Sequence, residues 1–174
     1  RRLTGADGYH LYEETRVQHM HTIKIAIIDP LPDGSGPSFE AVGARMASAL
    51  ARFPPFRRQL VTVPFGIGHP WWIDRPEIDP NYHLRRLAVR SPGGQAELDE
   101  VVSQIASVPL EREHPLWQLW FVEGLEHGRV AYVMKIHHAL ADGVASARLL
   151  MAAFQSDPTA GPPPAPEPVP RERW

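Results

Sequence analysis

Residues 129–138, Arg-Val-Ala-Tyr-Val-Met-Lys-Ile-His-His, constrain the fold more than any other stretch of the chain. Their β-branched and aromatic side chains predict a strand. A helix is predicted soon after it, because apolar residues recur near a period of 3.6 at Val144, Ala147, Met151 and Phe154. His137 and His138 therefore stand where a strand ends and a short connection to a helix begins. A rigid strand can present a side chain at the rim of a cleft in such a place.

The alternation of a strand separates the two histidines. His138 shares a face with Met134 and Ile136, whereas His137 shares the other face with Lys135. Only one imidazole can therefore point into a given cleft. A histidine with its ordinary pKa of about 6.5 is largely neutral at pH 7 and can act as a general base. The alternative is a pair of strand-end histidines before an ordinary turn.

The rest of the sequence predicts strands interleaved with helices, which is typical of a layered, mixed α/β fold. We expect a short helix within residues 1–21, a strand over 22–28, a helix over 38–53, irregular chain with short strands over 56–80, a strand over 82–89, a helix over 95–108 and a strand over 117–122. A glycine-containing connection over 124–128 predicts that the strand over 117–122 pairs antiparallel with the histidine strand.

Composition excludes several classes of protein. The 174 residues carry a formal net charge of −2, so no global basic field predicts nucleic-acid binding. The absence of cysteine excludes disulfides and cysteine-ligated metals. No apolar run approaches the roughly 20 residues that span a bilayer. We therefore expect a cytoplasmic protein with at most peripheral contact with a membrane or lipid droplets.

Proline dominates residues 156–174, which predict an extended linker rather than part of a core. We therefore expect one folded domain over residues 1–155 and a linker over 156–174. A linker implies something beyond it, and the alternative is a single-domain protein with a disordered tail.

The stretch His-His-Ala-Leu-Ala-Asp-Gly over residues 137–143 resembles the HHxxxDG signature of the chloramphenicol-acetyltransferase-like superfamily of acyltransferases, which includes the condensation domains of peptide synthetases. More narrowly, residues 3–154 resemble the N-terminal half of bacterial wax ester synthase/diacylglycerol acyltransferases. The narrower resemblance rests on the segment 7–21 with Met20-His21, on residues 66–70, on residues 81–86, and on Pro115-Leu116-Trp117 followed by residues 122–125. It implies a mixed, largely antiparallel sheet flanked by helices.

The resemblance also implies roles for the signature residues. His138 would be the general base, and His137 a structural neighbour. Asp142 would pair with an arginine, for which Arg16, Arg112 and Arg148 are candidates, and Gly143 would permit a tight turn. Pro115, Leu116 and Trp117 are candidates for shaping a substrate channel, although Trp117 is also expected simply to fill the core.

The implied reaction transfers an acyl group from long-chain acyl-CoA to diacylglycerol or a fatty alcohol, giving triacylglycerol or wax ester. Acyl-CoA is then a substrate, and neither a cofactor nor a metal is expected. The implied partner is a second, C-terminal half of the same enzyme, across a shared channel. Two alternatives stay open: a condensation-type acyltransferase that uses a carrier-bound thioester, and a non-catalytic lipid- or carrier-binding module that retains the motif.

Four side-chain pairs admit a second interpretation. Trp71-Trp72 is a candidate membrane-surface patch, although packing in the core or against a second half is favoured. His19 and His21 have the spacing of metal ligands but lack an evident third ligand. Arg57-Arg58 and Arg85-Arg86 suit coenzyme A phosphates, and surface solvation explains them equally well.

Overall fold

The computed structural model describes residues 3, 5–52, 54–63, 68–75 and 77–140. Its central sheet has four strands in the order β1 (His21–Ile28), β6 (Val130–His137), β5 (Trp117–Glu123) and β4 (Leu84–Ala88). β6 is antiparallel to both of its neighbours, and only the β4–β5 pair is parallel. The predicted mixed, largely antiparallel sheet is confirmed.

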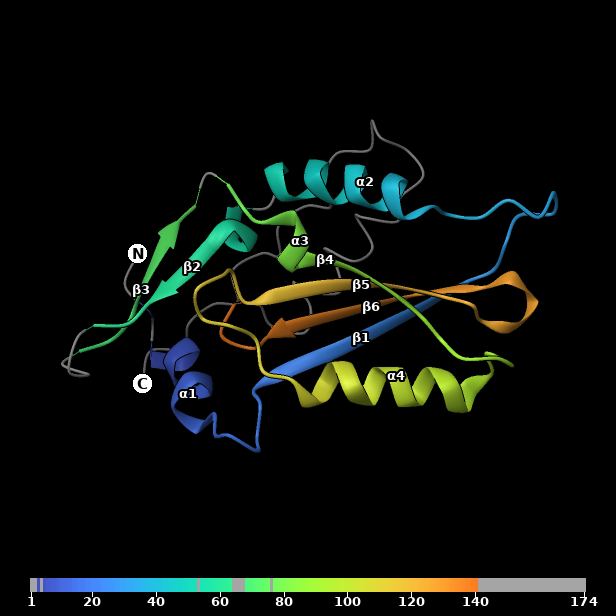
Figure 1. The fold of residues 1–174 in the computed structure, drawn as a ribbon. Coiled ribbons are helices and arrows are strands. Elements are labelled where there is room, and N and C mark those ends of the chain that lie inside the picture. Colours follow the sequence, from blue (N-terminus) through green and yellow to red (C-terminus); the bar gives the residue numbers. More distant parts are fainter. Residues whose placement is uncertain (1–2, 4, 53, 64–67, 76, 141–174) are drawn as a thin grey trace, which may run out of the picture.

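Two helices cover the two faces of this sheet (Figure 1). α2 (Phe39–Arg52) covers one face, and α4 (Gln95–Ser107) covers the other. Alternate residues of β6 divide between them as predicted, because Tyr132, Met134 and Ile136 pack in the α2 core whereas Ala131 and Val133 pack in the α4 core. The histidine strand is therefore buried on both faces.

The sequence explains where both helices begin. Ser38 caps α2, since its hydroxyl oxygen accepts a hydrogen bond from the Ala41 backbone N–H at 3.2 Å. Glu97 folds back on the first turn of α4, where its carboxylate accepts from the Gly94 N–H at 2.8 Å. The sequence predicts that Leu98, Val101, Val102 and Ile105 face the core. Leu98, Val101 and Ile105 are buried, and the half-buried Val102 packs against the same core.

The alternation of residues 22–28 predicts a half-buried strand with Ile23, Ile25 and Ile27 on one side, but β1 lies at the edge of the sheet. Of the three isoleucines that share a side, only Ile23 packs against the α4 core. Ile25 and Ile27 are 44% and 43% exposed. Ala26 and Ile28, on the other side, pack against the α2 core instead.

The predicted strand over residues 82–89 is shorter than expected. A short helix, α3 (Pro80–His83), replaces its first two residues, and β4 begins at Leu84. The helix forms because the Asp79 carboxylate accepts from the Asn81 N–H at 2.9 Å and Pro80 occupies the first helical position.

A smaller unit closes the end of the sheet at which β6 ends (Figure 1). It consists of α1 (Gly5–Glu13), the 3₁₀ turn η1 (Pro54–Arg57), and the antiparallel pair β2 (Arg58–Val61) and β3 (Trp71–Asp74). The predicted short strands in residues 56–80 are therefore confirmed. A third apolar cluster holds this unit together, formed by Leu3, Leu11, Leu60, Trp72, Leu110, Leu116 and Ala139.

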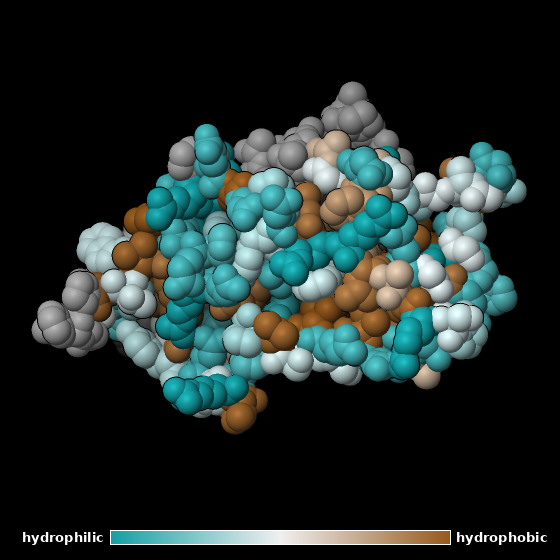
Figure 2. Space-filling model, in the orientation of Figure 1, coloured by the Kyte–Doolittle hydropathy of each residue, from teal (hydrophilic) through white to brown (hydrophobic). Residues whose placement is uncertain are grey.

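The β5–β6 hairpin contains a further 3₁₀ turn, η3 (Glu126–Gly128). The helix predicted over residues 144–154 and the linker over 156–174 lie outside the described residues. Within the part of the chain that is described, no helix has the length and apolar character needed to cross a membrane. Figure 2 shows apolar side chains at the surface between α2 and α4, on the side of the molecule where β4 forms the edge of the sheet.

Candidate active site

The two signature histidines lie where the opening segment of the chain meets the end of β6. His137 is the last residue of β6 and pairs in register with His21 of β1. The His138 N–H donates to the Met20 carbonyl oxygen at 2.9 Å. The Met20-His21 segment and the histidine signature, 116 residues apart in the sequence, are therefore joined by backbone hydrogen bonds.

His138 stays partly open to solvent. Its side chain is half-buried, and its ring stacks on that of His10 in α1, with a centroid distance of 5.0 Å and an interplanar angle of 25°. Burial lowers the pKa of His138 below its ordinary value, and the nearby His10 and Lys24 lower it further. The ring is therefore neutral at pH 7 and can accept a proton.

His137 is enclosed. Only 1% of the residue is exposed, and the Ala139 N–H donates to its Nδ1 at 3.0 Å. A neutral imidazole that accepts at Nδ1 carries its proton on Nε2. This Nε2 lies 3.6 Å from Glu14 Oε1, which is longer than a hydrogen bond. Burial lowers the pKa of His137 to about 4 against the raising effect of Glu14, so the ring fixes the turn after β6 as a neutral group.

An ion pair lies beside His137. Arg112 donates to Glu14 Oε2 at 2.8 Å, so one of the three arginines considered for Asp142 already binds another carboxylate. Arg16 is exposed and lines a shallow hollow with Glu14 and Arg112. Asp142, Gly143 and Arg148 lie outside the described residues, and the arginine partner of Asp142 stays a prediction.

Pro115, Leu116 and Trp117 form the inner support of the histidine strand. All three are buried, and the Leu116 carbonyl accepts from the His137 N–H at 3.0 Å. Trp117 is fully buried in the α2 core, where its Nε1–H donates to the Phe56 carbonyl at 2.8 Å. Its ring stacks on His83 with a centroid distance of 4.2 Å. This placement serves packing, and a role in a substrate channel stays a prediction.

Four of the side chains with a second interpretation have protein partners. The Nε2 atoms of His19 and His21 donate to the Ser107 and Ala106 carbonyls at the end of α4, at 3.2 and 3.0 Å. Arg58 pairs with Asp74 at 3.1 Å, and Arg86 pairs with Glu123.

The tryptophan pair is divided between core and surface. Trp72 is buried in the third apolar cluster, whereas Trp71 is 48% exposed. Packing in the core is therefore confirmed for Trp72, and a membrane contact of Trp71 stays a prediction.

A model of the wax ester synthase/diacylglycerol acyltransferase catalytic domain matches residues 3–173. The chain belongs to the wax ester synthase/diacylglycerol acyltransferase family. A Mycobacterium tuberculosis protein provisionally named a diacylglycerol O-acyltransferase is 49% identical over 150 residues, covering 86% of this chain and 32% of the relative. A second such protein from M. tuberculosis is 41% identical over 178 residues, covering 99% and 38%. The chain thus spans about a third of the length of the curated relatives that it matches.

Solved structures agree with this assignment. The wax ester synthase/diacylglycerol acyltransferase from Marinobacter aquaeolei VT8 is similar with a TM-score of 0.73 and 30% identity, over 85% of this chain and 37% of that one. The starter condensation domain of the rhizomide synthetase RzmA has a TM-score of 0.67 at 14% identity, over 87% and 35% of the two chains. At that identity the second similarity shows the shared fold alone.

Two residues beside the signature histidines escaped prediction. His10 stacks on His138, and Glu14 faces His137, yet both belong to a segment more than 120 residues upstream. Neither has a local pattern that points to the signature. Both residues reach the signature histidines only through tertiary contacts, which the sequence of one chain does not reveal.

Proposed function

We propose that the full-length protein is an acyl-CoA-dependent O-acyltransferase that esterifies diacylglycerol or a fatty alcohol, with His138 as the general base. One observation carries the assignment of the base. Of the two adjacent imidazoles, His137 is enclosed and holds the turn, whereas His138 is half-open and its pKa is lowered, which keeps it unprotonated. A base must be both reachable and unprotonated.

The proposed reaction requires one proton to move in each direction. The acceptor hydroxyl gives its proton to His138 while its oxygen bonds to the thioester carbonyl carbon. The carbon–sulfur bond then breaks, and the imidazolium returns the proton to the departing sulfur, giving an ester and free coenzyme A. The balance needs no covalent acyl-enzyme and no cofactor, since acyl-CoA enters as a substrate. A positioned base of this kind is worth about 10²–10⁴-fold in rate.

The remaining signature residues would support this base. His137 holds the turn after β6 through the Ala139 N–H, and Asp142 and Gly143 would shape the loop that follows. Pro115, Leu116 and Trp117 would position the wall from which the channel is built. The second wall would come from a C-terminal half of the same protein, an inference supported by the chain's span of about a third of its relatives' length.

The acceptors are lipids, so we propose that the enzyme meets them at a membrane or lipid-droplet surface. The exposed Trp71 and Ile73 of β3, 48% and 36% exposed, are candidate contact residues. This contact is peripheral in the proposal.

An acyl-transfer assay on the full-length protein tests the proposal. Labelled palmitoyl-CoA is offered with a diacylglycerol, a fatty alcohol and a fatty amine in competition, and the products are separated by chromatography. We expect esters as the main products. Replacing His138 by Ala should lower the rate by at least about 10²-fold. His127→Asn is the matched control, because His127 is exposed in the hairpin at the opposite end of β6.

Three results would contradict the proposal. A folded His138→Ala protein with full activity would remove the base. Transfer only from a carrier-bound thioester, or to the amine, would indicate a condensation-type enzyme. Acyl-CoA binding without any transfer would indicate a non-catalytic module.

A further inference from the structure

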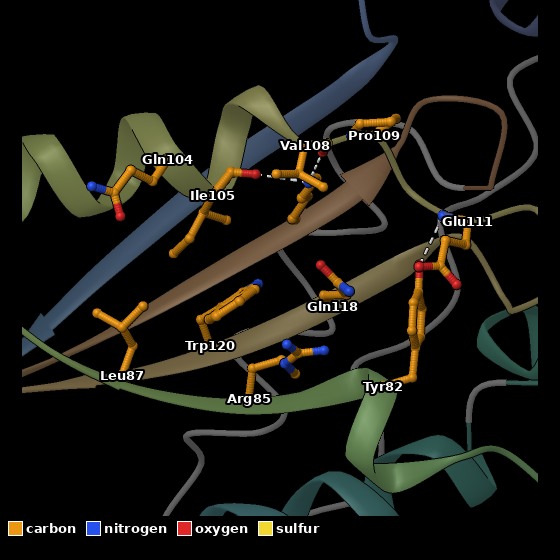
Figure 3. A pocket seen from close by; sticks show the side chains of 11 residues that line it. Tyr82, Arg85, Leu87, Gln104, Ile105, Val108, Pro109, Glu111, Gln118 and Trp120 are labelled. Atoms are coloured by element: carbon orange, nitrogen blue, oxygen red, sulfur yellow. Dashed lines mark hydrogen bonds between the residues drawn. The ribbon is translucent and has the colours of Figure 1, made fainter.

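A cavity lies on the face of the sheet that α4 covers. It occupies about 330 Å³ between the C-terminal end of α4 and strands β4, β5 and β6. This volume is at the small end of the range of ligand pockets. Figure 3 shows Trp120 and Gln118 extending from β5 beside Arg85 from β4, with Ile105 and Val108 of the α4 end facing them. Lys135 of β6 lines this cavity, whereas His138 follows the end of β6 and does not line it.

The sheet changes character where it forms the cavity. Away from the C-terminal end of α4, the sheet residues Val122, Ala131 and Val133 pack against the helix as ordinary core. Under the C-terminal end of α4 the sheet residues carry polar groups instead. Gln118 of β5 pairs in register with Lys135 of β6, and Arg85 of β4 pairs in register with Trp120 of β5. Leu87, Ile105 and Val108 add an apolar wall. One half of the cavity can therefore hold a polar group and the other half a hydrocarbon group.

The Gln118 amide is the observation that points to a ligand. Gln118 is only 8% exposed, yet its side chain forms no hydrogen bond with any described residue. The neighbouring Trp120 Nε1–H is likewise buried and without a hydrogen-bond partner in the described part of the chain. Buried polar groups in proteins are normally hydrogen-bonded, and leaving one unsatisfied costs stability. The buried indole N–H of Trp120 is therefore unsatisfied, and the Gln118 amide, which lines the cavity, has no partner among the described residues, so both groups are available to a ligand in the cavity.

The charges in the cavity indicate the sign of that ligand. Lys135 is 1% exposed, and its Nζ donates to the Ile105 carbonyl at 2.7 Å and to the Val108 carbonyl, which leaves one of its three donors free. Burial lowers the pKa of Lys135 to about 8, so it still carries its charge at pH 7. The Arg85 guanidinium lies 5.0 Å above the Trp120 ring. The one acid in the lining, Glu111, has a side chain that is 65% exposed at the rim.

We propose that this cavity binds a monocarboxylate with a short aliphatic chain. The carboxylate accepts hydrogen bonds from the Gln118 amide, the Trp120 indole N–H and the free Lys135 donor. The aliphatic chain lies against Leu87, Ile105 and Val108. Such a site is separate from the acyl-transfer site, because Lys135 lines the cavity, whereas the His138 ring lies one residue beyond β6 and stacks on His10 of α1.

The probe is hexanoate, with hexanamide, 1-hexanol and acetate as matched compounds. The full-length protein is labelled with ¹⁵N in its tryptophan indoles, and the Trp120 Nε1–H resonance is identified as the one that Trp120→Phe removes. We expect hexanoate to shift this resonance and to saturate at concentrations on the order of 1 mM or below. Hexanamide and 1-hexanol should bind at least about tenfold more weakly, because charge-assisted hydrogen bonds are the stronger ones. Acetate should not saturate.

Two substitutions at one position and one control test the residues. Gln118→Leu removes the amide and should weaken hexanoate binding about tenfold or more. Gln118→Glu keeps the shape of the side chain, places a carboxylate beside Lys135 and should abolish binding of an anion even if the leucine variant does not fold. Gln104→Leu is the control, because Gln104 lies at the exposed rim of the same cavity. The affinity of this variant for hexanoate should be within about twofold of that of the parent protein.

The proposal is overturned if hexanoate leaves the Trp120 resonance in place, or if 1-hexanol binds as tightly as hexanoate. Equal hexanoate binding by the parent and Gln118→Glu would overturn it as well. Hexanoate that only inhibits acyl transfer, with no change at Trp120, would place its binding at the His138 site instead.

Discussion

His83 should make the protein sensitive to acid, and replacing it should remove a defined part of that sensitivity. The residue is fully buried, its Nδ1–H donates to the Trp117 carbonyl at 2.8 Å, and its ring stacks on Trp117. Its Nε2 is buried without a hydrogen-bond partner among the described residues. Protonating that nitrogen would place an unpaired charge inside the core, which is unfavourable.

The magnitude follows from the pKa. Burial lowers the pKa of His83 from 6.5 to about 4. Between these two values the unfolded chain binds the proton and the folded protein does not, so the free energy of unfolding falls as the pH falls through 6.5. The loss is complete near pH 4 and amounts to about 3 kcal/mol, since one pKa unit corresponds to about 1.4 kcal/mol. Above pH 6.5 the full stability is present.

The perturbation is His83→Asn, whose side-chain amide can still donate to the Trp117 carbonyl. Urea denaturation followed by circular dichroism gives the free energy of unfolding at about pH 7.5 and about pH 5.0. At the higher pH the variant should be less stable by about 1–3 kcal/mol, because the stacked ring is lost and a small cavity remains. Between about pH 7.5 and about pH 5.0, however, the free energy of unfolding should fall by about 2 kcal/mol more in the parent than in the variant.

The comparison isolates His83 because His137, whose pKa is also about 4, contributes equally to parent and variant. His127→Asn is the control for removing a histidine, since His127 is exposed and Asn tolerates its positive φ of 62°. A His83→Asn curve that runs parallel to that of the parent would refute the argument. It would mean that the buried ring is already protonated in the folded protein or is solvated by opening of the structure.

Three further predictions concern the histidine turn, a glycine and the rate of acyl transfer. The His137→Leu substitution removes the ring nitrogen that accepts from the buried Ala139 N–H, so it should lower the free energy of unfolding in urea by about 1–3 kcal/mol. The His137→Asn substitution keeps an acceptor and should lower it by less. Gly93→Ala should destabilise the protein far more than Gly34→Ala: both have a φ of +80°, but a Cβ at Gly93 would lie 2.1 Å from a backbone oxygen, and one at Gly34 would meet nothing within 4 Å. Equal losses of melting temperature would contradict this. The kcat/KM of acyl transfer should persist to a lower pH than an unperturbed histidine allows, because the pKa of His138 is lowered by burial, His10 and Lys24; a profile that falls at the ordinary histidine pKa would contradict this.

Much of the fold could be predicted because its signals are local. The alternation of residues 129–138 located β6 to within one residue, and the capping Ser38 and the apolar stripe of residues 95–108 located both covering helices. The exposure of Ile25 and Ile27 could not be predicted, because a strand's alternation does not say whether it lies at the edge of a sheet. The predicted start of β4 was two residues too early, because Asp79-Pro80 favours a helical turn before the strand.

The candidate site, too, could be predicted only where its signals are local. The separation of His137 from His138 followed from strand parity alone, and the two histidines do differ in burial. The partners of those histidines did not follow, because His10, Glu14 and Arg112 reach the signature only through the folding of the opening segment onto β6. Lys135 is a similar case. Its burial depends on the end of α4 lying over β6, which puts carbonyl acceptors within reach of its Nζ.

The different environments of the two imidazoles depend on the register of β6. The His137 N–H is bound to the Leu116 carbonyl, and the His138 N–H is bound to the Met20 carbonyl, so the end of the strand is held from both sides. A slip of one residue would exchange the faces of every side chain in the strand, which would enclose His138 and expose His137. It would also move Lys135 from the cavity into the apolar α2 core, where a charge has no partner. The cost of burying Lys135 there therefore helps to keep His138 at the open face, and the two sites on opposite sides of β6 are fixed by the same register.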